Sequence, residues 1–159
     1  PRQLSRCRKR RNGNRSLQKM KGSSMAAYWL MKTEPSEYSY SDLEREKKTR
    51  WTGVANPLAL KHMRSMKKGD FAFIYHTGDE KAVVGIAEII SDSYADPGSK
   101  DPKLAVVDLR PRERLGKPVT LSEIKANKAF AGFELVRMPR LSVMPVPARL
   151  WETIQRMAR

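Results

Sequence analysis

Aromatic, amide and charged side chains gather at the ends of expected strands and helices in this chain. Proteins that read a base outside its stack combine aromatic faces with hydrogen bonds to the edge of the base. A set of this kind therefore predicts a pocket for a flat polar ring. Its members are Trp51, Tyr75 and His76 as π faces, Asn56 as donor and acceptor, and Lys32, Thr33 and Glu34 at the first strand end.

Each of these residues also has a purely structural interpretation. A tryptophan in the position of Trp51 is more often a lid on the core, and a lone histidine such as His76 is more often a surface imidazole. Asn56 is accounted for as a helix N-cap, and Glu34 as the partner of a nearby lysine. The cations expected on the outer face of the next helix either meet solvent or follow phosphates: Lys61, Arg64, Lys67 and Lys68.

Catalytic chemistry has little support in the sequence. The only cysteine is Cys7, there are two histidines, and neither a G-x-S-x-G elbow nor a phosphate-cradling glycine motif occurs. A zinc deaminase is excluded because its cysteine ligands are missing, and another catalyst would have only Glu34 or His76 as a general base. We expect a protein that is not an enzyme and needs no cofactor or metal. The alternative is an enzyme or small-molecule sensor acting on a nucleobase-like ligand.

Positive charge is concentrated at the start of the chain. The formal net charge is +15, yet residues 1–25 hold nine Lys or Arg and no acid, which leaves a net of +6 for the remainder. We expect a basic, disordered segment over 1–25, interpreted either as a nucleic-acid arm or as an upstream extension, and one domain over 26–159. No apolar run approaches a membrane span. The expected location is cytoplasmic, nucleoid-associated, or nuclear in a eukaryote.

The elements that must position these residues are short strands with helices between them. This pattern predicts an α+β domain around a curved sheet or small barrel. Expected strands cover 27–33, 70–76, 82–90, 104–111 and 140–146, and expected helices begin after Ser39 or Ser41, at Pro57, after Thr120 and at Pro147. The second of these helices is expected to end at Gly69, and residues 91–103 to form a loop.

Four separated stretches, taken in order, resemble the EVE domain family. They are "YWLMKTEPSEYSYSDL", "WTGVANPLALKHMRSMKKGDFAFIYHT", "VVGIAEI" and "RLSVMPV". The resemblance covers about Ala26 to Arg159. It implies a PUA-like mixed β-barrel with flanking helices, and a pocket that receives a flipped-out, often modified base of DNA or RNA. On this basis we expect a monomeric reader of modified nucleic acid with no membrane partner.

The resemblance also implies which residues bind the ligand. The family's K-T-E-P and W-x-G-V motifs, its Tyr-His pair and its R-L-S-V strand correspond to Lys32, Thr33 and Glu34, to Trp51, Gly53 and Val54, to Tyr75 and His76, and to Arg140 and Ser142. One departure stands out. Where the family commonly has Arg-Asn-Tyr after the W-x-G-V turn, this chain has Ala55, Asn56 and Pro57.

Overall fold

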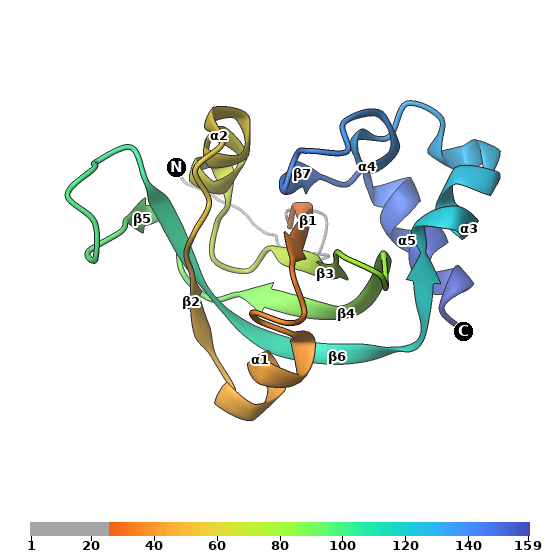
Figure 1. The fold of residues 1–159 in the computed structure, drawn as a ribbon, viewed down its shortest axis with the longest axis horizontal. Helices are drawn as coiled ribbons and strands as arrows, with labels where there is room; N and C mark the ends of the chain where they lie inside the picture. The colour runs from red at the N-terminus through yellow and green to blue at the C-terminus, as the bar shows by residue number, and fades with distance from the viewer. Residues whose placement is uncertain (1–25) are drawn as a thin grey trace, which may run out of the picture.

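A mixed, strongly curved sheet forms the centre of the structure, a computed structural model that describes residues 26–159 (Figure 1). Seven strands make up the sheet, in the order β2-β6-β4-β3-β1-β7, and β5 pairs with β6 outside this path. The sheet curls into a half-barrel with helices around it, so the expected PUA-like α+β class is confirmed. The expectation of disorder for 1–25 falls outside the described residues.

The boundaries of the elements are as follows. The strands are β1 (Tyr28–Thr33), β2 (Thr49–Trp51), β3 (Phe71–His76), β4 (Ala82–Ile89), β5 (Tyr94–Ala95), β6 (Ala105–Thr120) and β7 (Val143–Pro145). The helices are α1 (Tyr40–Glu46), α2 (Pro57–Ser65), α3 (Leu121–Ala126), the 3-10 helix η2 (Lys128–Phe130), α4 (Glu134–Arg137) and α5 (Ala148–Met157).

The central strand β1 pairs in parallel with β3 and antiparallel with β7. Strands β3 and β4 form the expected hairpin. Leu30, Met31 and Phe73 are fully buried, as near-continuous apolar runs in central strands predict. Because β1 is covered on both faces, its polar residues appear only at the carboxyl end, where the strand leaves the core.

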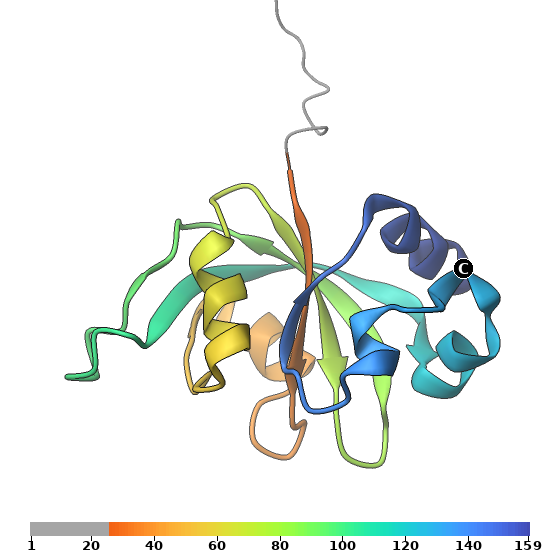
Figure 2. The same ribbon diagram turned by 90° about the horizontal axis from the view of Figure 1, so that it is seen from above.

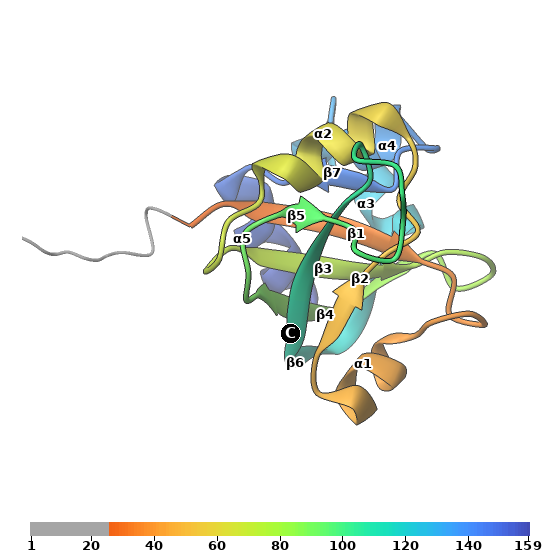
Figure 3. The same ribbon diagram turned by 90° about the vertical axis from the view of Figure 1, so that its left-hand side faces the viewer.

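Helix α2 fills the gap between the two edges of the half-barrel. The edge strands are β2 and β7, and they do not pair with each other. Figure 2 shows α2 on one side of β1 and α3, α4 and α5 on the other, and Figure 3 shows α1 and α2 on opposite sides of the sheet. The apolar face of α2 closes the gap, because Ala59, Leu60 and Met63 are buried.

Helix α1 is held on the sheet by a close approach to a glycine. The Tyr40 ring lies where a side chain on Gly85 would be, 2.5 Å from a Cβ placed there. The Tyr40 hydroxyl donates to the Ile86 carbonyl at 2.7 Å. Any larger residue at 85 would displace Tyr40, so this contact fixes the first residue of α1 on the sheet.

The structure corrects several boundaries. Helix α2 ends at Ser65 and not at Gly69, because the Met66 side chain turns into the core while Gly69 supplies the positive φ of the next turn. Trp51 is the last residue of a strand and not part of a turn. Strand β6 continues well beyond residue 111, because β4 pairs along most of its length. The elements β2, β5, η2 and α4 were not expected from the sequence.

Candidate functional site

A cavity of about 470 Å³ opens at the carboxyl end of β1. Four segments line it: residues 32–34 at the end of β1, residues 37–38 before α1, residues 49–54 in and after β2, and Ser142 just before β7. The cavity therefore lies where the ends of β1 and β2 meet the segment before β7.

The structure brings most of the expected site residues together. Those on the cavity lining are Lys32, Thr33, Glu34, Trp51, Gly53, Val54 and Ser142. Asn56, Tyr75, His76 and Arg140 do not line it. The lining combines one aromatic wall with charged and hydroxyl groups, which is the equipment for holding a flat polar ring.

Trp51 serves both as a core residue and as a cavity wall. It is 7% exposed and belongs to the hydrophobic core. Its ring meets Tyr38 edge to face, with centroids 6.1 Å apart and an interplanar angle of 87°. Because Tyr38 also lines the cavity, the two rings form one aromatic corner.

Lys32 and Thr33 hold two of the loops that surround the cavity. The Lys32 ammonium donates to the Pro139 carbonyl at 2.8 Å, and the Thr33 hydroxyl donates to the Tyr38 carbonyl at 2.7 Å. Lys32 also lies over the Tyr75 ring, with Nζ 5.6 Å from the centroid. Burial lowers the pKa of Lys32. An ammonium has three donors, so Lys32 retains donors for a ligand.

Glu34 holds a third loop. Its carboxylate accepts the Ser36 amide at 3.3 Å and the Thr77 hydroxyl at 3.2 Å. Hydrogen bonds, first from the Ser36 backbone, lower the pKa of Glu34. Glycine is favoured at Gly78 beside it, because φ there is +76°, a conformation that other residues rarely adopt. Glu34 therefore ties the segment between β1 and α1 to the turn after β3, which is not on the cavity lining.

His76 has a structural role in this arrangement. It is 6% exposed. Its Nε2 accepts the Tyr40 backbone N–H at 3.0 Å, and its Nδ1 lies 2.7 Å from Glu80 Oε1. With Nε2 accepting, the neutral ring carries its proton on Nδ1 and donates it to Glu80. Tyr75 is buried beneath Lys32, and adjacent residues of a strand face opposite sides, so Tyr75 and His76 cannot share one wall.

Asn56 and Arg140 flank the cavity. The Asn56 Oδ1 accepts the amides of Leu58 and Ala59 at 2.9 and 3.0 Å, so the expected N-cap is confirmed. Arg140 is exposed and lies two residues before Ser142. Neither residue needs to contact a ligand for the cavity to form, and the Asn56 Oδ1 is occupied in starting α2.

Sequence reasoning missed several residues on the lining. They are Glu37, Tyr38, Thr49, Arg50 and Thr52. The sequence offered no local signal for them, because their place on the lining depends on where β2 lies beside the end of β1. Among residues 26–159 no three His, Cys, Asp or Glu side chains are arranged to hold a metal. None of the helices in this range combines the length and apolarity that a bilayer crossing requires.

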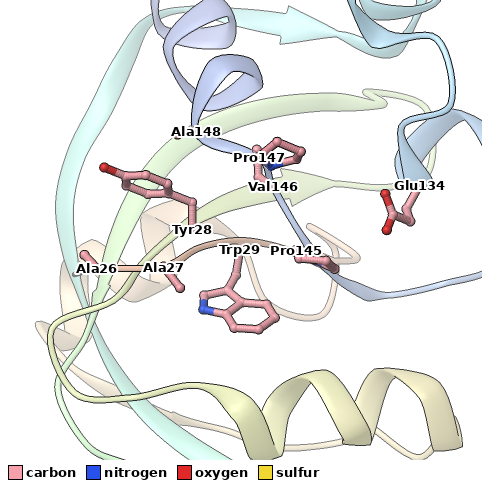
Figure 4. Close-up of a pocket in the computed structure, with 9 residues that line it drawn as sticks. All are labelled: Ala26, Ala27, Tyr28, Trp29, Glu134, Pro145, Val146, Pro147 and Ala148. Carbon is pink, nitrogen blue, oxygen red and sulfur yellow. The ribbon is translucent and has the colours of Figure 1, made fainter. Parts of the chain in front are cut away.

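A second cavity, of about 460 Å³, lies at the amino end of β1 (Figure 4). It is lined by residues 26–29, residues 145–148 and Glu134. Figure 4 shows Tyr28 and Glu134 at opposite sides of it, with Trp29 and Pro145 between them. Alanine, valine and proline supply most of the remaining lining, so this cavity offers few hydrogen-bonding side chains.

The sequence model of the EVE domain family matches residues 27–157 of this chain. The chain belongs to the EVE domain family. The resemblance noted from the sequence motifs is thereby confirmed. Thymocyte nuclear protein 1 of Rattus norvegicus is 32% identical over 159 residues, covering 79% of this chain and 70% of the relative.

Solved structures agree with this membership. The EVE domain described here is similar to Rpa0253 from Rhodopseudomonas palustris, with 41% identity, a TM-score of 0.80, and coverage of 84% of this chain and 93% of that one. It is also similar to the human THYN1 protein in complex with DNA containing 5-methylcytosine. That match has 26% identity, a TM-score of 0.77, and coverage of 84% and 98%.

Proposed function

We propose that this EVE domain binds DNA carrying a modified base and holds that base, turned out of the stack, in the cavity at the carboxyl end of β1. The observation that carries the proposal is the lining, where the wall of Trp51 meets the donors of Lys32 and Ser142 in one cavity. The similarity to human THYN1, whose structure contains 5-methylcytosine DNA, supports DNA as the partner.

The charges around the cavity favour a neutral ring over a phosphate. On the lining, Glu34 and Glu37 balance Lys32 and Arg50, so the cavity has no formal net charge that would attract a phosphodiester. A base has no net charge and presents ring faces and carbonyl or ring-nitrogen acceptors. Trp51 can stack on such a face, and the Lys32 ammonium can donate to such an acceptor.

The same groups support binding without catalysis. A general base needs a pKa near the working pH, whereas hydrogen bonds lower the pKa of Glu34. Both nitrogens of His76 are engaged by Tyr40 and Glu80. We therefore propose a monomeric reader that needs no cofactor and acts where DNA is found, in a nucleoid or a nucleus.

Titration of short oligonucleotides tests the proposal. DNA and RNA strands with cytosine or one 5-methylcytosine would be titrated against wild type, Trp51→Ala and Trp51→Phe, each checked for folding by circular dichroism. Losing the aromatic face should weaken binding by about 1 to 3 kcal/mol, while Trp51→Phe should retain most of the affinity. Trp29→Phe, at the other cavity, is the matched control and should bind like wild type.

Two results would contradict the proposal. Equal affinity of folded Trp51→Ala and wild type for every strand would return Trp51 to a purely structural role. A change in the mass of the oligonucleotide after incubation with wild type would indicate an enzyme. Preference for RNA over DNA would correct the choice of partner but not the cavity.

A further inference from the structure

Two helices begin close to the cavity along the chain, and they carry opposite charge. Helix α1 starts two residues after Tyr38, and helix α2 starts three residues after Val54, and both of these residues line the cavity. Helix α1 contains three carboxylates and one cation, whereas α2 contains the cations Lys61 and Arg64 and no carboxylate. Figure 3 shows the two helices on opposite sides of the sheet. A polyanion that binds at the cavity is therefore attracted to the α2 side and repelled from the α1 side.

The outer face of α2 carries its cations because the other face lies in the core. Ala59, Leu60 and Met63 are buried, whereas Lys61 and Arg64 are exposed. Residues three apart in a helix lie on the same face. The two cations therefore project from one side of α2, roughly 4.5 Å apart along the helix axis. Long side chains with this spacing can reach neighbouring phosphates of one strand.

Neither cation is neutralised by a carboxylate. Within residues 26–159, none of the ion pairs includes a residue of α2. The Arg64 Nη1 donates to the Lys103 carbonyl at 3.1 Å. This contact holds the guanidinium in place, leaves its charge uncompensated, and leaves Nε and Nη2 as donors for an external acceptor.

Other charged groups near α2 contribute less. Lys68 follows the helix, but the Asp92 carboxylate accepts the Lys68 amide at 2.9 Å and offsets charge there. The Asp101 carboxylate likewise accepts the Lys103 amide at 2.9 Å. Burial lowers the pKa of His62, so this residue of α2 adds no charge at neutral pH. The uncompensated charge on this side of the domain therefore lies mainly on the two exposed cations of the helix itself.

We infer that the outer face of α2 binds backbone phosphates of the duplex next to the inserted base, through Lys61 and Arg64. This inference rests on the proposed function. A cavity that receives one base leaves the flanking base pairs outside, so the duplex needs a second surface that accepts its backbone. Ammonium and guanidinium groups bind phosphates without regard to sequence. The cavity selects the base, and α2 holds the duplex against the domain.

Salt titrations of a duplex that contains one 5-methylcytosine test the inference. Lys61→Gln and Arg64→Gln should each flatten the dependence of log K on log salt by roughly 0.9, and the double variant by roughly twice as much. A duplex without the methyl group should show the same losses, because phosphate contacts carry no information on the base. Lys125→Gln, at an exposed position of α3, is the matched control and should leave the slope unchanged.

A conservative variant separates the charge of Arg64 from its contact with the loop at Lys103. Arg64→Lys keeps the positive charge and loses the guanidinium, so its slope should stay close to that of wild type. Each variant is checked by circular dichroism, and the unfolding midpoint should not change, because both side chains of α2 are exposed. Equal flattening in Arg64→Lys and Arg64→Gln would show that Arg64 acts by holding the loop, and would overturn its contact with phosphate.

The outcomes separate this inference from the function on which it rests. Unchanged slopes in the double variant, with binding still weakened in Trp51→Ala, would overturn the phosphate surface on α2 and leave the reader intact. Flattened slopes in the double variant, with full affinity in Trp51→Ala, would support the phosphate surface and overturn the inserted base.

Discussion

The two ends of β1 carry cavities of nearly equal volume, about 460 and 470 Å³, with different chemistry. Near the amino end the buried polar group is Asp70, which is not on the cavity lining and has its hydrogen bonds filled. It accepts the amides of Ala27 and Lys67 and the indole N–H of Trp29, each at 3.0 Å. At the carboxyl end Lys32 keeps donors in reserve. The two linings therefore differ in the number of charged and hydroxyl side chains more than in volume, and the carboxyl-end cavity is the richer in them.

Removing the buried carboxylate near the amino end of β1 should have the largest effect on stability. Asp70→Ala leaves three N–H groups without their acceptor, and each buried donor left unpaired costs about 1 to 3 kcal/mol. We expect the free energy of unfolding to fall by about 3 kcal/mol or more, measured by urea denaturation. Asp79→Ala, at an exposed turn position, is the control. A loss no greater than that of the control would show that water replaces the carboxylate.

Removing the ammonium group at the carboxyl end of β1 should instead affect oligonucleotide binding. Lys32→Met removes a charged donor, and hydrogen bonds to charged groups contribute about 1.5 to 3 kcal/mol. We expect oligonucleotide affinity to fall by that amount while the unfolding midpoint changes little, because the desolvation of the ammonium disappears with it. Partial recovery in Lys32→Arg would support a donor role. Equal loss of affinity and stability would mean that Lys32 only holds Pro139.

Asn56 tests whether a rim residue outside the cavity has a second role. Asn56→Ala should reduce the free energy of unfolding by about 1 kcal/mol, because two amides at the start of α2 lose their acceptor, and Asn56→Ser should restore most of the loss. Chemical denaturation and oligonucleotide titration would be run on the same preparations. Stability restored without binding would assign Asn56 a ligand contact.

The smallest expected effect is on the pH dependence of the melting temperature. The pKa of Glu34 in the folded chain is lowered from its ordinary value of 4.5, chiefly by the Ser36 amide. A lowered folded pKa gives stability that is present above the unfolded value and is lost as pH falls through the folded one. Between about pH 6 and pH 3, wild type should therefore lose more of its melting temperature than Glu34→Gln. Identical losses, followed by circular dichroism, would show that these hydrogen bonds contribute nothing.

The sequence predicted those parts of the fold that depend on residues close to each other along the chain. The N-cap at Asn56, the β3–β4 hairpin and the capping box at Thr120 each rest on residues close in sequence. Strand β6 was cut short in prediction because residues 110–118 are charged and contain two prolines and a glycine. Only pairing with β4, a tertiary effect, makes that stretch a strand.

The candidate site divides in the same way. The family motif pointed to Lys32, Trp51 and Ser142, which do line one cavity. It could not show that both ring nitrogens of His76 are hydrogen-bonded, to Tyr40 and Glu80, since those contacts depend on tertiary structure. Strand alternation alone would have separated Tyr75 from His76.

The gap between β2 and β7 has a consequence for how this architecture evolves. A barrel closed by strand pairing has a bore set by strand number and stagger, which changes only in large steps. Here α2 closes the gap, and its buried contacts come from side chains such as Leu60 and Met63. A substitution of a single methylene there would resize the bore gradually, and methionine adapts readily to irregular space. Proteins that descend from one ancestral sequence could thus accommodate ligands of different size without a change in the sheet.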